Sequence, residues 1–417
     1  MTGRCEGKRV VVALSGGIAC YKVPEVVRLL RAAGARVRVV MTRSACEFIT
    51  PLTLQTLAGE PVATELFDLT QESEIGHIRL ADDADVVLVA PATANLIGKA
   101  AAGLGDDLLT TVLLATRAPV LLAPAMNVHM WENPIVQENL ERLRRHGWRL
   151  IAPGVGALAC GYEGAGRLAE PPLIVAEIER ALTPQDLHGE RVLVTAGPNR
   201  EPIDPVRFIS NRSTGRMGYA LAMAAWRRGA EVVLVSGPTA LPDPHGVRCE
   251  RVQTAAEMHD AVRREFATAT MLFMAAAVAD YTPATPRDQK LKKTAGPMRL
   301  DLTRTVDILG ALRGRAGQRL VVGFAAETED VEGNAERKLR SKGLDLIVAN
   351  DVTAPGAGFA VDTNAVTLID ASGRTAIPLA SKDEIADRIL DRALALAQAR
   401  RASGRRPAAP ARARRRR

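Results

Sequence analysis

Short, continuous apolar runs alternate with amphipathic stretches along most of the chain. Residues 9–14 (Arg-Val-Val-Val-Ala-Leu) form the first run, and a helical pattern then extends to Ala33. Gly34 ends that helix, and 36–41 is again strand-like. Strands that are apolar on both faces and are separated by helices are typical of parallel sheets covered on both sides. Further strands of this kind are expected at 85–90, 119–123 and 148–152.

The same beginning occurs a second time at 191–196, with a helix expected over 215–228 and a strand over 232–235. Two such starts predict an α/β chain of two tandem doubly wound, Rossmann-like parallel-sheet domains, the first flavodoxin-like. Pro171-Pro172 to Gly189 contains the linker, so we expect domains at 1–188 and 189–399. The other expected elements of the second domain are strands at 271–275, 320–324 and 344–349 and a last helix at 382–398.

Composition adds a basic tail to this picture. The net charge is +8, but residues 400–417 contain nine arginines and no acid, so the rest of the chain is close to neutral. An Ala/Pro/Arg segment cannot form a core, and we expect a disordered, solvated end. The charge therefore does not indicate a specific nucleic-acid partner.

Cysteine usage and hydropathy point to the compartment. The five cysteines are scattered and include no Cys-x-x-Cys pair, which supports neither a disulfide framework nor a zinc site. No apolar run approaches 18 residues and no leader-like segment opens the chain. We therefore expect a cytoplasmic protein with no membrane partner.

A nicotinamide-dependent dehydrogenase is the first hypothesis for such a fold, and the sequence argues against it. Neither glycine turn reads Gly-x-Gly-x-x-Gly. Neither second strand ends in the acid that would bind an adenosine ribose, since the ends read 41–44 (Met-Thr-Arg-Ser) and 236–238 (Ser-Gly-Pro). Hydroxyls and backbone amides at these ends suit a phosphate monoester better.

Polar motifs gather at the strand ends of the first domain. They are 15–19 (Ser-Gly-Gly-Ile-Ala), 91–95 (Pro-Ala-Thr-Ala-Asn) and 123–127 (Ala-Pro-Ala-Met-Asn), with His77 before the second. The glycine-rich segment 157–168 holds a single thiol, Cys160. Glycine at this density predicts a mobile loop that could deliver one reactive group to a site. Each motif alone could be an ordinary turn, cap or core residue, but together they predict an active site.

The second domain has a different set of polar motifs. Residues 207–218 form a polar loop that runs into a helix N-terminus, which suits phosphate oxygens. Asp280 is an acid at the end of an expected buried strand. Lys290 and Lys292 share one face if residues 290–293 are extended. Lys338 and Lys342 are four apart on an expected helix and share a face. Together these features favour a nucleoside triphosphate site.

The first-domain motifs, taken with Pro-Ala-Met-Asn-x-x-Met-Trp at 124–131 and Leu-Ala-Cys-Gly-x-x-Gly-x-Gly-Arg at 158–167, resemble those of the flavin-dependent cysteine decarboxylases. The second half resembles phosphopantothenate–cysteine ligase. Together the two halves resemble the bifunctional decarboxylase/ligase family of coenzyme A synthesis, over about residues 7–395.

For the first domain, the resemblance implies FMN-dependent decarboxylation of phosphopantothenoylcysteine. Carried over by motif, His77 is the base or orienting group of the oxidation, Asn127 binds the substrate carboxylate, and Cys160 is the proton donor to the ene-thiolate. A thiol suits this step because its pKa lies near that of the thiolate that it protonates. The implied FMN contacts are Gly16, Gly17, Ser44, Thr93 and Asn95.

For the second domain, the resemblance implies that CTP activates 4′-phosphopantothenate as an acyl-cytidylate, which the amine of L-cysteine then attacks. Asn211, Arg207 and Ala276 would surround the acyl intermediate, and Lys290 would bind the phosphates. Mg²⁺ would be held mainly through phosphate oxygens. The family's trimeric flavin fold and dimeric ligase fold suggest a homo-oligomer, a dodecamer. The implied CTP-binding residues are Met274, Ala275, Ala276, Asp280, Lys290, Val306, Asp307, Ile308, Leu309, Phe324, Lys338 and Lys342.

Three turns depart from the family's pattern. They read Gly-Pro-Asn at 197–199, Ser-Thr-Gly-Arg at 213–216 and Thr-Val-Asp at 305–307 in place of Gly-Gly-Thr, Ser-Ser-Gly-Lys and Asn-Pro-Asp. Proline removes an amide donor, and arginine does not simply replace lysine at a phosphate. We expect these departures to affect the rate of ligation and the preference among nucleotides.

The rival hypothesis is a non-catalytic flavin-binding regulator on the first-domain fold, which would lack Cys160, Asn127 or the ligase half.

Overall fold

The computed structural model describes residues 3–66, 76–157, 162–292, 297–314, 317–351, 353, 356, 358–359 and 361–403. The chain divides into two compact units, Met1–Pro184 and Gln185–Arg417, joined after α9.

The first unit contains a parallel sheet with the strand order β2-β1-β3-β4-β5. All pairings are parallel, and the order is that of flavodoxin-like folds, whose ligands bind where the order reverses, between β1 and β3. The strands are β1 (Arg9–Leu14), β2 (Arg36–Met41), β3 (Val86–Ala92), β4 (Val120–Pro124) and β5 (Arg149–Leu150).

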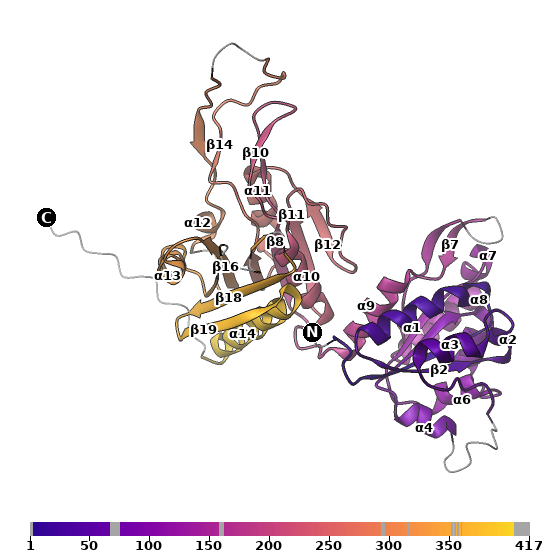
Figure 1. Ribbon diagram of the computed structural model, residues 1–417. Helices are drawn as coiled ribbons and strands as arrows, with labels where there is room; N and C mark the ends of the chain where they lie inside the picture. The colour runs from indigo at the N-terminus through magenta and orange to yellow at the C-terminus, as the bar shows by residue number, and fades with distance from the viewer. Residues whose placement is uncertain are drawn as a thin grey trace. The chain divides into compact units, whose positions relative to one another are not determined.

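Helices cover both faces of this sheet (Figure 1). Val10, Val12 and Leu14 of β1 face one buried cluster, whereas Val11 and Ala13 face the other. The first cluster packs against η1 (Ile18–Lys22), α1 (Val23–Ala32), α2 (Arg43–Cys46), α3 (Pro51–Ala58) and α9 (Pro171–Leu182). The second packs against α4 (Gly76–Asp82), α5 (Ala94–Ala102), α6 (Leu108–Ala115) and α8 (Pro134–Arg145). The predicted doubly wound fold is therefore confirmed.

Two antiparallel strands overlap the segment 157–168, which the sequence predicts to be a loop. β6 (Gly154–Ala157) pairs with β7 (Glu163–Arg167), and β7 contacts the short helix α7 (Val128–Trp131). Glycine composition alone would not indicate strands, but Gly164 and Gly166 lie at positive φ against α7 and the turn before it. Cys160 lies outside the described residues.

The second unit contains a mixed sheet with the order β12-β11-β8-β13-β16-β17-β18-β19. Its first six strands are parallel and have the Rossmann order. β18 and β19 are antiparallel additions at the edge, which the pattern did not predict because neither is a continuous buried run. The strands are β8 (Arg191–Ala196), β11 (Glu231–Ser236), β12 (Arg248–Arg251), β13 (Met271–Met274), β16 (Leu320–Glu327), β17 (Leu346–Asp351), β18 (Thr363–Asp370) and β19 (Gly373–Ser381).

Helices α10 (Arg216–Arg227) and α14 (Lys382–Ser403) pack against each other in the second unit, and α11 (Ala255–Phe266), α12 (Ile308–Leu312) and α13 (Val331–Lys342) carry residues of another buried cluster. The hairpins β9 (Arg200–Pro202) with β10 (Phe208–Ser210) and β14 (Tyr281–Pro283) with β15 (Leu302–Arg304) contact each other and lie away from β19 (Figure 1).

The last helix corrects the predicted start of the tail. α14 continues to Ser403, so Arg400 and Arg401 are helical rather than part of a disordered end. Arg400 pairs with Asp345 and Arg401 pairs with the buried Glu190, which explains why the helix extends this far. Residues 404–417 lie outside the described residues. Among the helices that are described, none combines the length and apolar character that crossing a membrane requires.

Candidate active sites

A cavity of about 1040 Å³ opens at the carboxyl ends of the strands in the first unit. Residues that follow β1, β2, β3 and β4 all contribute to its lining. The structure brings together six residues that the sequence analysis singled out from four separate motifs: Gly16, Gly17, Ser44, Thr93, Asn95 and Asn127.

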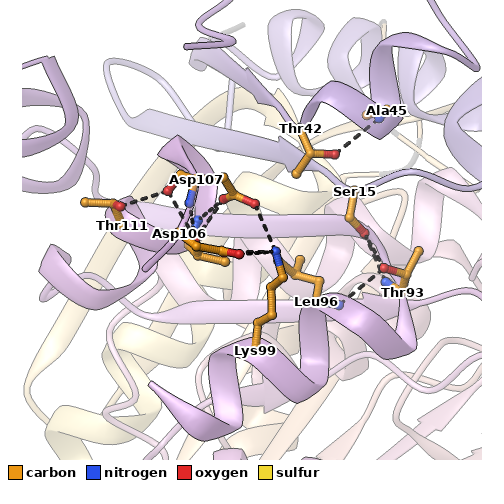
Figure 2. A network of polar contacts seen from close by, with 10 residues as sticks. Ser15, Thr42, Ala45, Thr93, Leu96, Lys99, Asp106, Asp107 and Thr111 are labelled. Atoms are coloured by element: carbon orange, nitrogen blue, oxygen red, sulfur yellow. Dashed lines mark hydrogen bonds and ion pairs between the residues drawn. The ribbon is translucent and has the colours of Figure 1, made fainter. Parts of the chain in front are cut away.

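Ser15 joins the ends of β1 and β3 beneath this cavity (Figure 2). Its buried Oγ donates to the carbonyl of Pro91 at 2.7 Å and accepts from the backbone N–H of Thr93 at 3.0 Å. Thr93 in turn caps α5 by accepting from the N–H of Leu96. The two turns on either side of the switch point are therefore held at a fixed spacing.

Gly16 allows the turn after β1 to touch the turn after β2. A Cβ at Gly16 would lie 2.4 Å from the Cβ of Ser44 and 2.8 Å from its backbone, which real side chains do not tolerate. A Cβ at Gly17 would meet only Thr93 Cγ2 and Pro91 Cγ, at 3.5 Å or more. The first glycine is required by a close approach, whereas a Cβ at the second would make only ordinary van der Waals contacts.

Asn127 is fixed by the helix that it caps. Its Oδ1 accepts from the backbone N–H of His129 at 2.8 Å, at the start of α7. The N–H of the neighbouring Met126 donates to the carbonyl of Gly166 at 3.0 Å, and a Cβ at Gly166 would lie 2.3 Å from the carbonyl oxygen of Met126. The β6–β7 hairpin thus lies directly against the Asn127 turn.

Lys99 is a cavity residue that the sequence analysis missed. It lies one helical turn after Asn95 on α5, and its ammonium contacts Asp106 at 2.8 Å and Asp107 at 3.7 Å (Figure 2). The hydrogen bond to Asp106 raises the pKa of Lys99. The Asn95–Lys99 spacing of four could have identified it. His77, by contrast, is half-buried on α4 and is not among the described residues that line this cavity.

A second cavity, of about 830 Å³, opens at the carboxyl ends of β13, β16 and β17. Of the predicted CTP-binding residues, only Lys290 is absent from its described lining; it lies exposed in the segment between β14 and β15. The others line it together: Met274, Ala275, Ala276, Asp280, Val306, Asp307, Ile308, Leu309, Phe324, Lys338 and Lys342.

The two lysines of α13 have different environments in this cavity. Lys338 donates to the carbonyl of Phe324 at 2.7 Å, and burial lowers its pKa. Lys342 pairs with Asp307, which caps α12 by accepting from the N–H of Gly310. Burial alone would raise the pKa of Asp307, but the hydrogen bonds from Lys342 and Gly310 outweigh it and lower that pKa.

One wall of the second cavity was missed entirely. Lys382, which is 6% exposed, donates to the carbonyls of Gly358 and Val361, the former at 2.9 Å. Asn350 also lines this wall, and its buried Oδ1 has no hydrogen-bond partner among the described residues. No local pattern identifies this wall, because its contacts join segments that are far apart in the chain.

One of the turns that depart from the family pattern contacts the same wall. Thr214 donates to the carbonyl of Phe359 at 2.6 Å, and Arg216 pairs with Asp362 at 2.5 Å. Both side chains therefore tie the polar loop before α10 to the segment that Lys382 also holds.

Of the residues expected around the acyl intermediate, Ala276 lines this cavity, whereas Asn211 and Arg207 are absent from its described lining. Asn211 donates to the carbonyl of Ala277 and accepts from the N–H of Ser213 at 2.9 Å, whereas the N–H of Ala276 donates to Thr195 Oγ1 at 3.1 Å. Arg207 is outside the described lining and pairs with Asp204. Among the described residues, no three His, Cys, Asp or Glu side chains gather as metal ligands.

Comparison with known proteins assigns each half to a family. Residues 2–183 match the Flavoprotein family model, and residues 187–396 match the model for the DNA/pantothenate metabolism flavoprotein C-terminal domain. The coenzyme A biosynthesis bifunctional protein CoaBC of Bacillus subtilis is 50% identical over 94% of this chain and 98% of its own length. The corresponding protein of Escherichia coli K12 is 46% identical over 92% of this chain and 96% of its own.

Two solved structures are similar to parts of the chain. A crystal structure of the C-terminal domain of CoaBC is 41% identical, covering 52% of this chain and 99% of that chain with a TM-score of 0.45. A PPC decarboxylase mutant complexed with pantothenoylaminoethenethiol is 35% identical, covering 41% and 96% with a TM-score of 0.37.

The two family models and the full-length relatives confirm the resemblance drawn from the sequence motifs. The chain belongs to the family of CoaBC bifunctional proteins of coenzyme A biosynthesis, with a flavoprotein decarboxylase domain followed by a ligase domain.

Proposed function

We propose that the second unit couples L-cysteine to 4′-phosphopantothenate at the expense of CTP and that the first unit decarboxylates the product to 4′-phosphopantetheine. The observation that carries the proposal is the pair of cavities at the two sheet ends, each lined by residues of the matching motifs. The decarboxylase activity is assigned to 1–188 and the ligase activity to 189–399.

The first cavity suits FMN. Gly16 and Gly17 line the cavity beside the Ser15–Thr93 pair without side chains that would fill it, and the N-terminus of α5 offers N–H groups to a phosphate. Gly16, Gly17, Ser44, Thr93 and Asn95 would hold the cofactor. FMN supplies the two-electron oxidation of the substrate's thiol-bearing carbon and the return of those electrons after CO₂ is lost.

The protein's own residues supply position and protons in this reaction. Asn127, whose Oδ1 is held by the N–H of His129, would bind the substrate carboxylate through its amide. Cys160 would protonate the ene-thiolate, and His77 would act in the oxidation. Both of these roles stay predictions, since Cys160 lies outside the described residues and His77 outside the described lining.

The second cavity suits a nucleoside triphosphate. The carboxylate of 4′-phosphopantothenate would attack the α-phosphate of CTP, releasing pyrophosphate and leaving an acyl-cytidylate. The amine of cysteine would then displace CMP and form the amide. Lys338, Lys342 and Lys290 would balance the phosphate charge, and Mg²⁺ would be held mainly by phosphate oxygens because the described residues offer no cluster of three ligands.

The test uses the purified full-length chain with 4′-phosphopantothenate, cysteine and either CTP or ATP. We expect a yellow protein with releasable FMN, pyrophosphate and CMP formed with CTP, and CO₂ released in proportion to the coupled product. A colourless protein without FMN would contradict the first half of the proposal. A flavin-containing protein that forms no product with either nucleotide would instead favour the flavin-binding regulator.

A further inference from the structure

The buried carboxylate of Asp204 organises a turn that lies between β9 and β10. Its side chain is 0% exposed. Oδ1 accepts from the backbone N–H groups of Val206 at 2.9 Å and Arg207 at 2.8 Å, so it closes the turn itself. Oδ2 accepts from the guanidinium of Arg207 at 2.6 and 2.9 Å and from the backbone N–H of Leu291 at 3.1 Å.

Leu291 is held at both of its backbone groups. While its N–H donates to Asp204, its carbonyl accepts from Arg207 Nη2 at 2.7 Å. One side-chain pair therefore gives this residue the two hydrogen bonds that a neighbouring strand would give it. Burial alone would raise the pKa of Asp204, but the Arg207 guanidinium and the three backbone donors outweigh it and lower that pKa, so the carboxylate remains charged.

The same turn holds the chain a second time, four residues earlier. The N–H of Arg287 donates to the carbonyl of Ile203 at 3.0 Å, and the N–H of Ile203 donates to the carbonyl of Arg207 at 2.8 Å. Arg287 and Leu291 are thus both tied to residues 203–207. Lys290 lies in the stretch of three residues between these ties, on an otherwise exposed segment.

We infer that Asp204 and Arg207 are positioning residues that act through Lys290. Holding the N–H of Leu291 restricts the Cα of Lys290, since both belong to the same planar peptide unit. An exposed lysine segment without such ties would have to be ordered each time the nucleotide binds, at an entropic cost. The role rests on the proposed function, because it assumes that Lys290 binds the phosphates of CTP.

Position 204 requires a carboxylate because each of its two oxygens accepts hydrogen bonds from different donors. An amide at position 204 keeps one acceptor oxygen but replaces the other with a donor, so either the turn or the tie to Leu291 is lost. Asp204→Asn is therefore the primary variant. Asp288→Asn is the matched control, because Asp288 is exposed in the same segment and takes no part in the contacts of Asp204. Arg207→Lys is a second variant that leaves the carboxylate in place and removes the forked donor to Asp204 and Leu291.

The first measurement is independent of activity: the rate at which trypsin cleaves after Lys290 and Lys292 in the native full-length protein. We expect Asp204→Asn and Arg207→Lys to be cleaved about tenfold faster than the parent and Asp288→Asn to be cleaved at the parental rate. Equal protection in all four proteins would overturn the inference. Arg207→Lys keeps the test decisive if Asp204→Asn does not fold.

The second measurement is a double-mutant cycle on the KM for CTP. Asp204→Asn should raise this KM about tenfold, with a smaller effect on kcat. In a Lys290→Gln background the same substitution should change the residual KM by less than twofold, because the group through which it acts is gone. An undiminished effect in that background would show that Asp204 acts elsewhere. If the parent protein does not use CTP at all, the proposed function fails, while the trypsin result still reports on the anchoring.

Discussion

The two cavities occupy the same position in related sheets but are built by different means. In the first unit, short turns meet at backbone distance: Gly16 touches Ser44, and Ser15 joins Pro91 to Thr93. In the second unit, lysine ammonium groups are fixed by backbone carbonyls, as the half-buried Lys338 is by Phe324 and the buried Lys382 is by Gly358. On the proposed function, the first arrangement would select its ligand by shape, whereas the second would offer positive charge to a polyanion.

This difference has an energetic basis. A flat cofactor with one phosphate needs a close-fitting wall, and a single added methyl group can displace a turn that has no free space. A triphosphate needs positive charge that does not have to be reorganised when the nucleotide binds or reacts. Added volume should therefore damage the first site, and lost charge should damage the second.

The largest effect is expected at Lys338. Lys338→Met removes an ammonium group that the carbonyl of Phe324 holds at the cavity wall. We expect CTP-dependent coupling to fall about 100-fold, equivalent to about 2.7 kcal/mol, while decarboxylation of supplied phosphopantothenoylcysteine is unchanged. Steady-state assays of both activities measure this. Arg337→Gln, at an exposed neighbour on the same helix, serves as the control. Equal loss of both activities in a folded protein would contradict the division of charge and shape between the sites.

Gly16 provides the corresponding test of the first site. A Cβ there would lie 2.4 Å from Ser44 Cβ, so Gly16→Ala must displace the turn after β2. We expect about tenfold less FMN in the purified protein, with ligase activity retained. The matched control is Gly17→Ala, whose Cβ meets Thr93 Cγ2 at 3.5 Å, an ordinary contact. The visible absorption spectrum and the released flavin measure occupancy. Equal flavin content in the two variants would remove the steric argument.

The sequence was sufficient where a site is formed by the residues that directly follow a strand. The strands 9–14 and 191–196 were predicted to the residue, and the motifs after four strands of the first unit meet in one cavity. What it could not reveal are contacts between distant segments. Lys382 reaches Gly358 and Val361 from the start of α14, and no local period marks that wall.

Two local patterns were also misread for physical reasons. The glycines of the segment 157–168 suggested a loop, but Gly164 and Gly166 are strand residues whose missing Cβ atoms make room for Val128 and Met126. The edge strands β18 and β19 contain too many polar residues to look like buried runs, and most of β19 is exposed. In both cases the structure depends on contacts with a neighbouring element and not on the local sequence pattern.

The pH profile of coupling should reveal the buried charge of the second site. Burial lowers the pKa of Lys338 from its ordinary value of 10.5. An amine with a lowered pKa loses its proton, and its attraction for phosphate, as the pH rises through that lower value. We expect kcat/KM for CTP to decline before pH 10.5 is reached, by several-fold, and the decline to be absent in Lys338→Arg because guanidinium keeps its proton. A parallel decline in both proteins would assign the titration to another group.

The smallest effect is expected at the end of the chain, where two truncations separate a folded helix end from the tail. Removal of 404–417 takes away seven of the nine arginines of 400–417. Exposed charges act over about 10 Å at ordinary ionic strength, so both activities should stay within about twofold. Kinetics at low and moderate salt measure this, and a large loss at both salts would show that the tail supports a site.

Compared with removal of 404–417, removal of 400–417 should lower the stability of the protein and leave the rates of both reactions unchanged. It also deletes Arg400, which pairs with Asp345 and donates to the carbonyl of Arg319 at 2.9 Å, and Arg401, whose guanidinium lies 2.7 Å from Glu190. The carboxylates of Asp345 and Glu190 are 18% and 8% exposed, so each loses a charged partner that water only partly replaces. We expect a loss of about 1–3 kcal/mol, or a fall in Tm of about 2–12 °C for the unfolding transition of the second unit. Because the first unit is the one that matches the Flavoprotein family model, the release of flavin on heating should follow the same temperature in both truncated proteins. If flavin release shifted together with the unfolding transition of the second unit, the two units would not unfold independently. The two sites would then differ in their chemistry but not in their stability.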